Sequence, residues 1–169
     1  MWNRDSFHNC AMLLSNVSNA FQNAFVSASR MEQLQGNRDL LKYSRDGIEL
    51  LQSIALTVRS EQDYKLVPKS ELTVGALCQP AHLSFEKFAE SYHPPYKAEG
   101  GFSKMLLRTA LDKIAHYDPR KTTFRASRDI HEIIIGGTHK NEDWIAVLSI
   151  PAFCQAVMKL PDHPVNQRD

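Results

Sequence analysis

The chain has 169 residues, and its 20 lysines and arginines nearly balance 19 aspartates and glutamates, so the formal net charge is +1. Hydrophobic residues make up 43% and charged residues 23%, which are the proportions of a folded globular protein and exclude general disorder. This length predicts one domain, which we place at residues 1–161, followed by a flexible polar tail at residues 162–169. We expect a cytoplasmic protein without membrane contact, because no apolar run approaches the roughly 20 residues of a membrane span and the N-terminus lacks a secretory signal.

Two long helices are predicted in the first third of the chain. Apolar or small residues recur every three or four positions over residues 7–31 and again over residues 41–58, as one buried face of a helix requires. Gly36 and Asn37 interrupt the pattern, so we expect a short link and an antiparallel helix pair. The regular spacing in the first helix also fits a coiled-coil seam of a homodimer, and this alternative stays open.

The middle of the chain is predicted to hold two short helices and a loop. Residues 63–80 lose the periodicity, and we interpret them as a connector with a short helix at residues 70–77. Another short helix is expected at residues 84–92. Paired prolines and paired glycines then make residues 93–101 a loop, because proline lacks the amide donor and restricts the residue before it.

The last third changes its period from helix to strand. A third strong helix is predicted at residues 102–117, where apolar side chains again follow helical spacing. β-Branched and aromatic residues then predict a β-hairpin with a longer loop near residues 129–149, and Pro151 opens a final short helix that ends at Pro161. The predicted fold class is mainly α: a helical bundle with a long antiparallel helix pair and a C-terminal β-hairpin followed by a short helix.

No metal or cofactor site is predicted. The cysteines are widely spaced and form no Cys-x-x-Cys pair, so we interpret all of them as reduced core residues. They are Cys10, Cys78 and Cys154. His131, Glu132 and His139 share the predicted hairpin, but positions along paired strands do not by themselves define a coordination shell. We therefore expect no bound metal and no cofactor.

Positive charge is concentrated between residues 104 and 128, where seven basic residues stand against Asp112 and Asp118. The basic residues are Lys104, Arg108, Lys113, Arg120, Lys121, Arg125 and Arg128. Guanidinium and ammonium groups displace counterions from a polyanion, so this segment is a candidate nucleic-acid-binding surface. A solvated helix face beside an acidic neighbour is the alternative.

The segment at residues 111–118, Leu-Asp-Lys-Ile-Ala-His-Tyr-Asp, is the most distinctive part of the sequence. It resembles the signature of HEPN domains, in which an arginine followed by a polar residue precedes a histidine by several positions. The polar, aliphatic, histidine and aromatic positions of that signature are matched by Asp112, Ile114, His116 and Tyr117.

The HEPN resemblance implies a helical bundle that acts on RNA. Such domains occur in bacterial toxin, abortive-infection and CRISPR-linked ribonucleases, where a histidine and an arginine from each of two subunits face each other and cleave RNA without metal. Leu111 occupies the place of that arginine here, and Arg108 lies one helical turn earlier, from where its guanidinium could reach His116. The C-terminal third also resembles uncharacterised small proteins from bacterial genomes and mobile elements.

The leading hypothesis is a HEPN-like protein without the standard catalytic arginine that binds RNA or a host or phage protein in a defence or mobile-element setting. One alternative is a metal-independent endoribonuclease, in which Arg108 and His116 are the catalytic residues of a homodimer and Asp112 and Tyr117 support them. Another is a pure protein-interaction inhibitor or antitoxin-like protein. A helix-terminal histidine with a purely structural role is the simplest alternative for His116.

Overall fold

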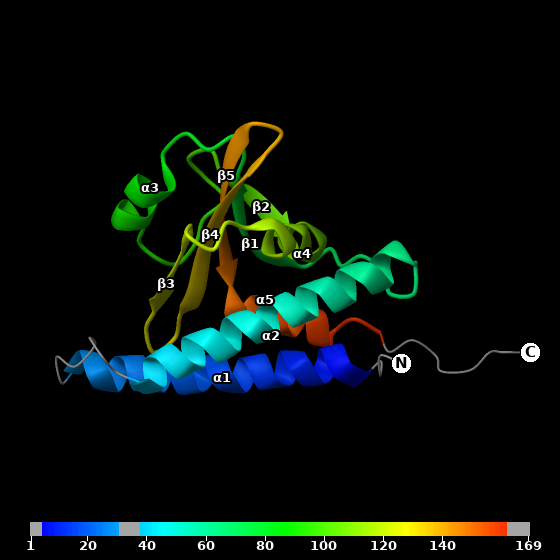
Figure 1. The fold of residues 1–169 in the computed structure, drawn as a ribbon, viewed down its shortest axis with the longest axis horizontal. Coiled ribbons are helices and arrows are strands. Elements are labelled where there is room, and N and C mark those ends of the chain that lie inside the picture. Colours follow the sequence, from blue (N-terminus) through cyan, green and yellow to red (C-terminus); the bar gives the residue numbers. More distant parts are fainter. Residues whose placement is uncertain (1–4, 31–37, 162–169) are drawn as a thin grey trace, which may run out of the picture.

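The structure, a computed structural model, describes residues 5–30 and 38–161 (Figure 1). In chain order its elements are α1 (Asp5–Arg30), α2 (Arg38–Asp63), β1 (Thr73–Cys78), α3 (Phe85–Ser91), β2 (Ser103–Leu106), α4 (Leu107–His116), β3 (Thr122–Ala126), β4 (His131–His139), β5 (Glu142–Ser149) and α5 (Ile150–Met158). The link predicted at Gly36 and Asn37 and the tail predicted at residues 162–169 lie outside the described residues.

The predicted helical bundle is wrong, because a five-stranded sheet occupies the centre of the fold. The strands lie in the order β2-β1-β5-β4-β3, and every neighbouring pair is antiparallel. Helices α1, α2, α4 and α5 pack on one face of the sheet, which we call the helix face, and α3 covers the opposite face, which we call the α3 face (Figure 1). The fold class is therefore mixed α and β.

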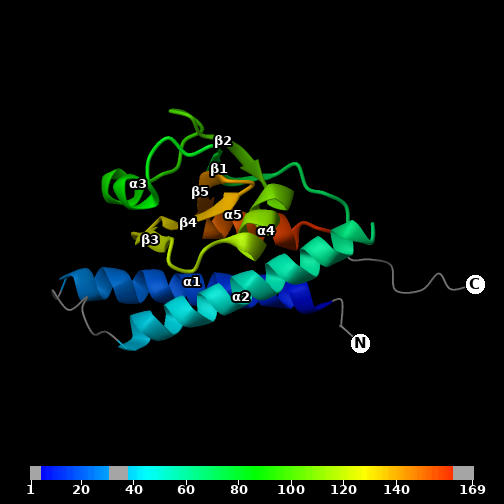
Figure 2. The same ribbon diagram turned by 45° about the horizontal axis from the view of Figure 1, so that its top comes forward.

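The long antiparallel helix pair expected from the first two apolar stripes is present as α1 and α2. Figure 2 shows the two helices side by side along the helix face. Leu14 and Phe21 of α1 and Leu51 and Val58 of α2 are at most 3% exposed. Burying each such side chain contributes about 1.5–3 kcal/mol, so packing against the sheet and against each other holds these helices in place.

The hairpin predicted near residues 129–149 corresponds to β4 and β5, but its turn is tight. Lys140 and Asn141 alone connect the strands, with φ of 49° and 66°, and positive φ at both central residues matches a two-residue type I′ turn. Gly136 and Gly137 of the hairpin lie inside β4. A Cβ on Gly137 would stand 2.5 Å from Cζ2 of Trp144, so this glycine makes room for a buried indole.

Three strands were mistaken for other structure or not predicted at all. The helix expected at residues 70–77 is β1, and the first turn of the helix expected at residues 102–117 is β2, which pairs with β1. A Cβ on Gly75 would stand 2.0 Å from the carbonyl oxygen of Val147, which shows how closely β1 approaches β5. The third strand, β3, was not predicted. Short strands like these are stabilised by cross-strand partners that local periodicity does not reveal.

The cysteines are free, as expected, with Cys78 and Cys154 buried and Cys10 partly buried. Burial raises the pKa of the Cys154 thiol to about 12, which makes this thiol unreactive at neutral pH. Within residues 5–30 and 38–161, no helix combines the length and the apolar character that crossing a membrane requires.

Candidate functional site

Helix α4 has one face buried in the core and one face turned toward α2. Its buried residues are Leu107, Ala110, Leu111 and Ile114. Arg108, Asp112 and His116 are spaced four residues apart and so share a different face of the same helix. Arg108 and Asp112 are partly buried, whereas His116 is exposed. The segment singled out by the sequence therefore presents a line of ionisable groups at the seam between α2 and α4.

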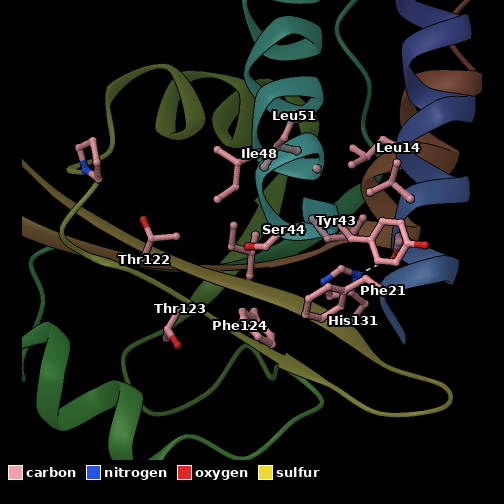
Figure 3. Close-up of a pocket in the computed structure, with 16 residues that line it drawn as sticks. Leu14, Phe21, Tyr43, Ser44, Ile48, Leu51, Thr122, Thr123, Phe124 and His131 are labelled. Carbon is pink, nitrogen blue, oxygen red and sulfur yellow. Dashed lines mark hydrogen bonds between the residues drawn. The ribbon is translucent and has the colours of Figure 1, made fainter. Parts of the chain in front are cut away.

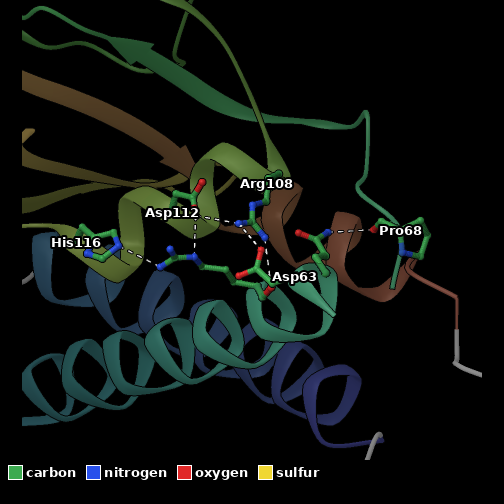
Figure 4. A network of polar contacts seen from close by, with 7 residues as sticks. Asp63, Pro68, Arg108, Asp112 and His116 are labelled. Carbon is green, nitrogen blue, oxygen red and sulfur yellow. Dashed lines mark hydrogen bonds and ion pairs between the residues drawn. The ribbon is translucent and has the colours of Figure 1, made fainter. Parts of the chain in front are cut away.

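A chain of polar contacts joins these residues to Arg59 of α2. Figure 4 shows this network from Asp63 to His116. Nη1 of Arg59 donates to Nε2 of His116 at 3.0 Å. Nε of Arg59 lies 2.9 Å from Oδ1 of Asp112, but the two atoms do not form an aligned hydrogen bond, so this contact is an ion pair. The chain therefore links His116 through Arg59 to Asp112.

Arg108 stands at the other end of this chain and does not contact His116. Its Nη2 lies 2.8 Å from Oδ1 of Asp63 and 3.5 Å from Oδ1 of Asp112, and its Nη1 donates to the backbone oxygen of Arg59 at 3.2 Å. Arg59, which the sequence analysis did not single out, therefore supplies the guanidinium beside His116. Its only sequence signal is its position directly after Val58, at the edge of the apolar stripe of α2.

A polar groove of about 790 Å³ opens beside this chain, between α4 and the β1 and β4–β5 part of the sheet. Its lining includes Arg59, Arg108, Asp112, Lys113, His116 and His139. Nζ of Lys113 donates to Oε1 of Gln79 at 2.6 Å and stands 4.5 Å from the centre of the Trp144 ring. Burial lowers the pKa of Lys113. We call this cavity the polar groove.

Two of the predicted basic residues are neutralised outside the polar groove. Arg120 pairs with Asp118 at 2.9 Å through a side chain that is 90% exposed, and Nζ of Lys121 lies 3.6 Å from Oδ1 of Asp143. The side-chain hydrogen bonds from Arg120, together with a hydrogen bond from its backbone N–H, lower the pKa of Asp118. Arg120 and Lys121 lie in the loop between α4 and β3, outside the lining of the polar groove.

The other predicted basic residues are also apart from the groove. Lys104 is exposed on β2 and Arg128 is exposed in the loop between β3 and β4. Arg125 donates to the backbone oxygens of Ala89 and Phe124, so its guanidinium holds the end of α3 against β3. Of the seven predicted residues, the fold brings only Arg108 and Lys113 into the polar groove.

The two supporting residues have separate roles. The carboxylate of Asp112 forms ion pairs with both Arg59 and Arg108. The hydroxyl of Tyr117 accepts a hydrogen bond from Nε2 of Gln52 at 3.2 Å, and burial raises the pKa of this tyrosine. Asp112 thus belongs to the site, whereas Tyr117 fastens the end of α4 to α2.

The hairpin residues weighed as metal ligands are not brought together. His131 and His139 stand at opposite ends of β4, and Glu132 projects to the face opposite His131 because side chains alternate along a strand. Among the residues that the structure describes, no three histidine, cysteine, aspartate or glutamate side chains cluster as metal ligands would.

Glu132 is the centre of a second buried polar cluster, on the α3 face. The side chain is 3% exposed. Its Oε2 accepts from the hydroxyl of Tyr92 at 2.5 Å and its Oε1 accepts from the backbone N–H of Tyr96 at 2.9 Å. Burial and the Glu132 hydrogen bond together raise the pKa of Tyr92. This cluster ties the loop after α3 to the start of β4.

Comparison of the chain with protein-family models, with curated proteins and with solved structures gives no match. The central sheet departs from the helical bundle that the HEPN resemblance implied. That resemblance stays a prediction that concerns the segment at residues 111–118, and any function has to be argued from the groove itself.

Proposed function

We propose that this protein binds the phosphate backbone of RNA in the polar groove between α4 and the sheet. The single observation that carries the proposal is the pairing of an exposed imidazole with a guanidinium, 3.0 Å apart, at the edge of a polar groove. Three basic side chains, Arg59, Arg108 and Lys113, line that groove against two carboxylates, Asp112 in the lining and Asp63, which pairs with Arg108. A phosphate would therefore meet a local excess of positive charge.

The ion pairs hold the side chains of Arg59 and Arg108 in place for phosphate binding. A guanidinium offers a planar fork of donors that matches two oxygens of a phosphate. Asp112 holds Arg59 from one side, and Asp63 holds Arg108 in the same way. Fixing the long side chains before binding reduces the entropy that is lost when the ligand arrives.

The lining favours contacts to the backbone over contacts to the bases. Trp144, which supplies the one indole ring among the described residues that line the groove, is 2% exposed and is covered by Lys113, so its face is closed to a stacking base. Thr109 and Thr138 add hydroxyl groups to the lining, and such groups can bond to phosphate or to the ribose 2′-hydroxyl. We expect binding that tolerates many sequences and prefers RNA to DNA.

Fluorescence anisotropy with a labelled 12-nucleotide single-stranded RNA, measured over a series of salt concentrations, tests this proposal. We expect Lys113→Glu to weaken binding about tenfold, or about 1.4 kcal/mol, and to lower the slope of log affinity against log salt by about 0.7 for the lost phosphate contact. Lys104→Glu is the matched control, since it makes the same charge change at an exposed position outside the groove. Equal losses in the two variants, or no salt-dependent affinity in the wild type, contradict the proposal.

The Arg59–His116 contact also favours a second candidate, metal-independent cleavage of the bound RNA. The neutral imidazole, once Nε2 is released from its contact with Arg59, would take the proton of a ribose 2′-hydroxyl, the 2′-oxygen would attack the phosphorus, and the 5′-oxygen would leave and take a proton from water. Arg59 would stabilise the extra negative charge on the phosphoryl oxygens. In this scheme Arg59 replaces the Arg108 of the sequence hypothesis, because Arg108 is held at Asp63, away from His116.

Cleavage predicts a 2′,3′-cyclic phosphate product that forms in the presence of EDTA. His116→Ala is expected to abolish the product while RNA affinity changes little. His139→Ala removes another imidazole from the same groove and serves as the control that retains cleavage. Binding without any cleavage in the wild type leaves the binding proposal in place and removes the enzymatic one.

A further inference from the structure

A second cavity, of about 360 Å³, lies between the helix pair and the β3–β4 edge of the sheet (Figure 3). We call it the aromatic pocket. Its walls are mainly apolar and include Leu14, Phe21, Ile48, Leu51, Phe124 and Ile133. The rings of Phe21 and Phe124 meet edge to face, with centroids 4.7 Å apart. A cavity of this size falls at the lower end of the range of about 300–1,000 Å³ that small-molecule pockets occupy.

An imidazole supplies a polar group in this apolar wall. Nδ1 of His131 is hydrogen-bonded to Oγ of Ser18 at 2.6 Å, and the ring stacks on Phe21 with centroids 4.9 Å apart. Burial lowers the pKa of His131 to about 4, so the ring is uncharged at neutral pH. Its Nε2 has no hydrogen-bond partner within residues 5–30 and 38–161.

A hydroxyl group in the lining is also without a partner. Oγ1 of Thr122 is buried and makes no hydrogen bond in the part of the chain that the structure describes. Buried polar atoms are nearly always hydrogen-bonded, and an unpaired one is destabilising unless a bound molecule completes it. The Thr122 hydroxyl is closed to solvent, so the unused hydrogen-bonding capacity that a ligand would meet in the apolar wall is Nε2 of His131.

Gly47 keeps part of the pocket open. It lies in the middle of the 26-residue helix α2, where glycine is less favourable than alanine. A Cβ at this position would meet Cγ1 of Val17 at 3.7 Å and Cδ1 of Leu14 at 3.9 Å, which are ordinary contact distances. Neither close packing nor a positive φ demands a glycine here, so its absent side chain contributes open volume.

We propose that the aromatic pocket binds a small uncharged aromatic molecule that carries one hydroxyl group. The ring of the ligand would pack among Phe21, Phe124 and the aliphatic wall. Its hydroxyl would bond to Nε2 of His131, which donates or accepts according to the tautomer. A charged ligand is disfavoured because no lysine, arginine, aspartate or glutamate lines the pocket among the described residues. This site is separate from the polar groove and does not rest on RNA binding.

Titration calorimetry with 2-naphthol and with naphthalene, its twin without the hydroxyl, tests the proposal on the whole chain. We expect 2-naphthol to bind at least about tenfold more tightly, since one hydrogen bond to a buried partner is worth about that factor. Amide chemical shifts of a ¹⁵N-labelled sample should change around Gly47 and His131. The proposal is overturned if 2-naphthol does not bind, or if both compounds bind equally well.

Two variants locate the binding site. Gly47→Leu fills the pocket and is expected to lower the affinity for both compounds more than tenfold, whereas Ser60→Leu, an exposed position on the same helix, is expected to leave it unchanged. His131→Phe keeps a ring but removes the polar group, so it should abolish the preference for 2-naphthol. Unchanged affinity in a folded Gly47→Leu protein, or an unchanged preference in His131→Phe, contradicts the assignment. Circular dichroism verifies the fold of each variant.

Discussion

His131 and Glu132 are neighbours on β4, yet they enter opposite faces of the sheet and meet different surroundings. On the helix face, His131 has one nitrogen bonded to Ser18 and the other open toward a cavity. On the α3 face, both carboxylate oxygens of Glu132 accept hydrogen bonds, one from the hydroxyl of Tyr92 and one from the backbone N–H of Tyr96. Burial alone therefore does not mark a functional polar group. Unused hydrogen-bonding capacity beside an open volume distinguishes His131 from Glu132.

The largest expected effect concerns the helix face and depends on pH. Burial lowers the pKa of His131 to about 4, whereas in the unfolded chain it lies near 6.5. The unfolded state therefore binds a proton first, so the free energy of unfolding is highest above about pH 6.5 and falls by about 3 kcal/mol as the pH drops to 4. Urea unfolding of wild type and His131→Phe at several pH values measures this difference. An equally steep pH dependence in the variant contradicts the assignment to His131.

On the α3 face, removing one hydrogen bond from the Glu132 cluster should lower the free energy of unfolding. Tyr92→Phe removes the hydroxyl that donates to Oε2 of Glu132 and leaves a carboxyl group that is 3% exposed with one donor fewer. We expect a loss of about 2 kcal/mol in the free energy of unfolding, because a hydrogen bond to a charged group contributes about 1.5–3 kcal/mol. Tyr64→Phe is the control, since Tyr64 is 76% exposed. Equal stability of the two variants contradicts this interpretation.

Sequence reasoning located the parts of the fold whose signal is local. The amphipathic stripes of α1 and α2 and the hairpin of β4 and β5 were predicted, because their buried faces repeat within a short stretch of chain. The strands β1, β2 and β3 were missed because each acquires its identity from a partner distant in sequence. Gly75, for example, falls inside the helix predicted at residues 70–77, whereas in the sheet it permits close approach of β1 to Val147.

In the candidate site, too, the residues related by local spacing were predicted, and those brought together by tertiary packing were missed. Arg108, Asp112 and His116 were found because they lie four residues apart on one helix. Arg59 was missed because it comes from α2, 57 residues before His116, and only the packing of α2 on α4 brings the two together. The aromatic pocket was missed entirely, since its lining is drawn from separate helices and strands.

A third prediction compares a glycine on each face. Gly47→Ala on the helix face should raise the free energy of unfolding by about 0.5–1 kcal/mol, because alanine favours the helix and its Cβ has room. Gly136→Ala on the α3 face should lower it, because the Cβ would stand 2.9 Å from Cδ2 of Phe85. Thermal unfolding of both variants measures the contrast. A loss of stability in Gly47→Ala would show that the pocket is not open at this point.

The smallest expected change in stability belongs to Arg59, at the edge of the helix face. Its side chain is 30% exposed and that of Asp112 is 41% exposed, and ion pairs with such access to water contribute only about 0–1 kcal/mol. Arg59→Ala should therefore unfold in urea almost as the wild type does, while its RNA affinity falls about tenfold. If the free energy of unfolding falls by several kcal/mol instead, the contacts of Arg59 serve mainly to hold α2 and α4 together, as the Glu132 cluster holds the loop after α3. A small loss of stability with a large loss of RNA affinity identifies Arg59 as a binding residue, because the fold then does not depend on its guanidinium whereas RNA binding does.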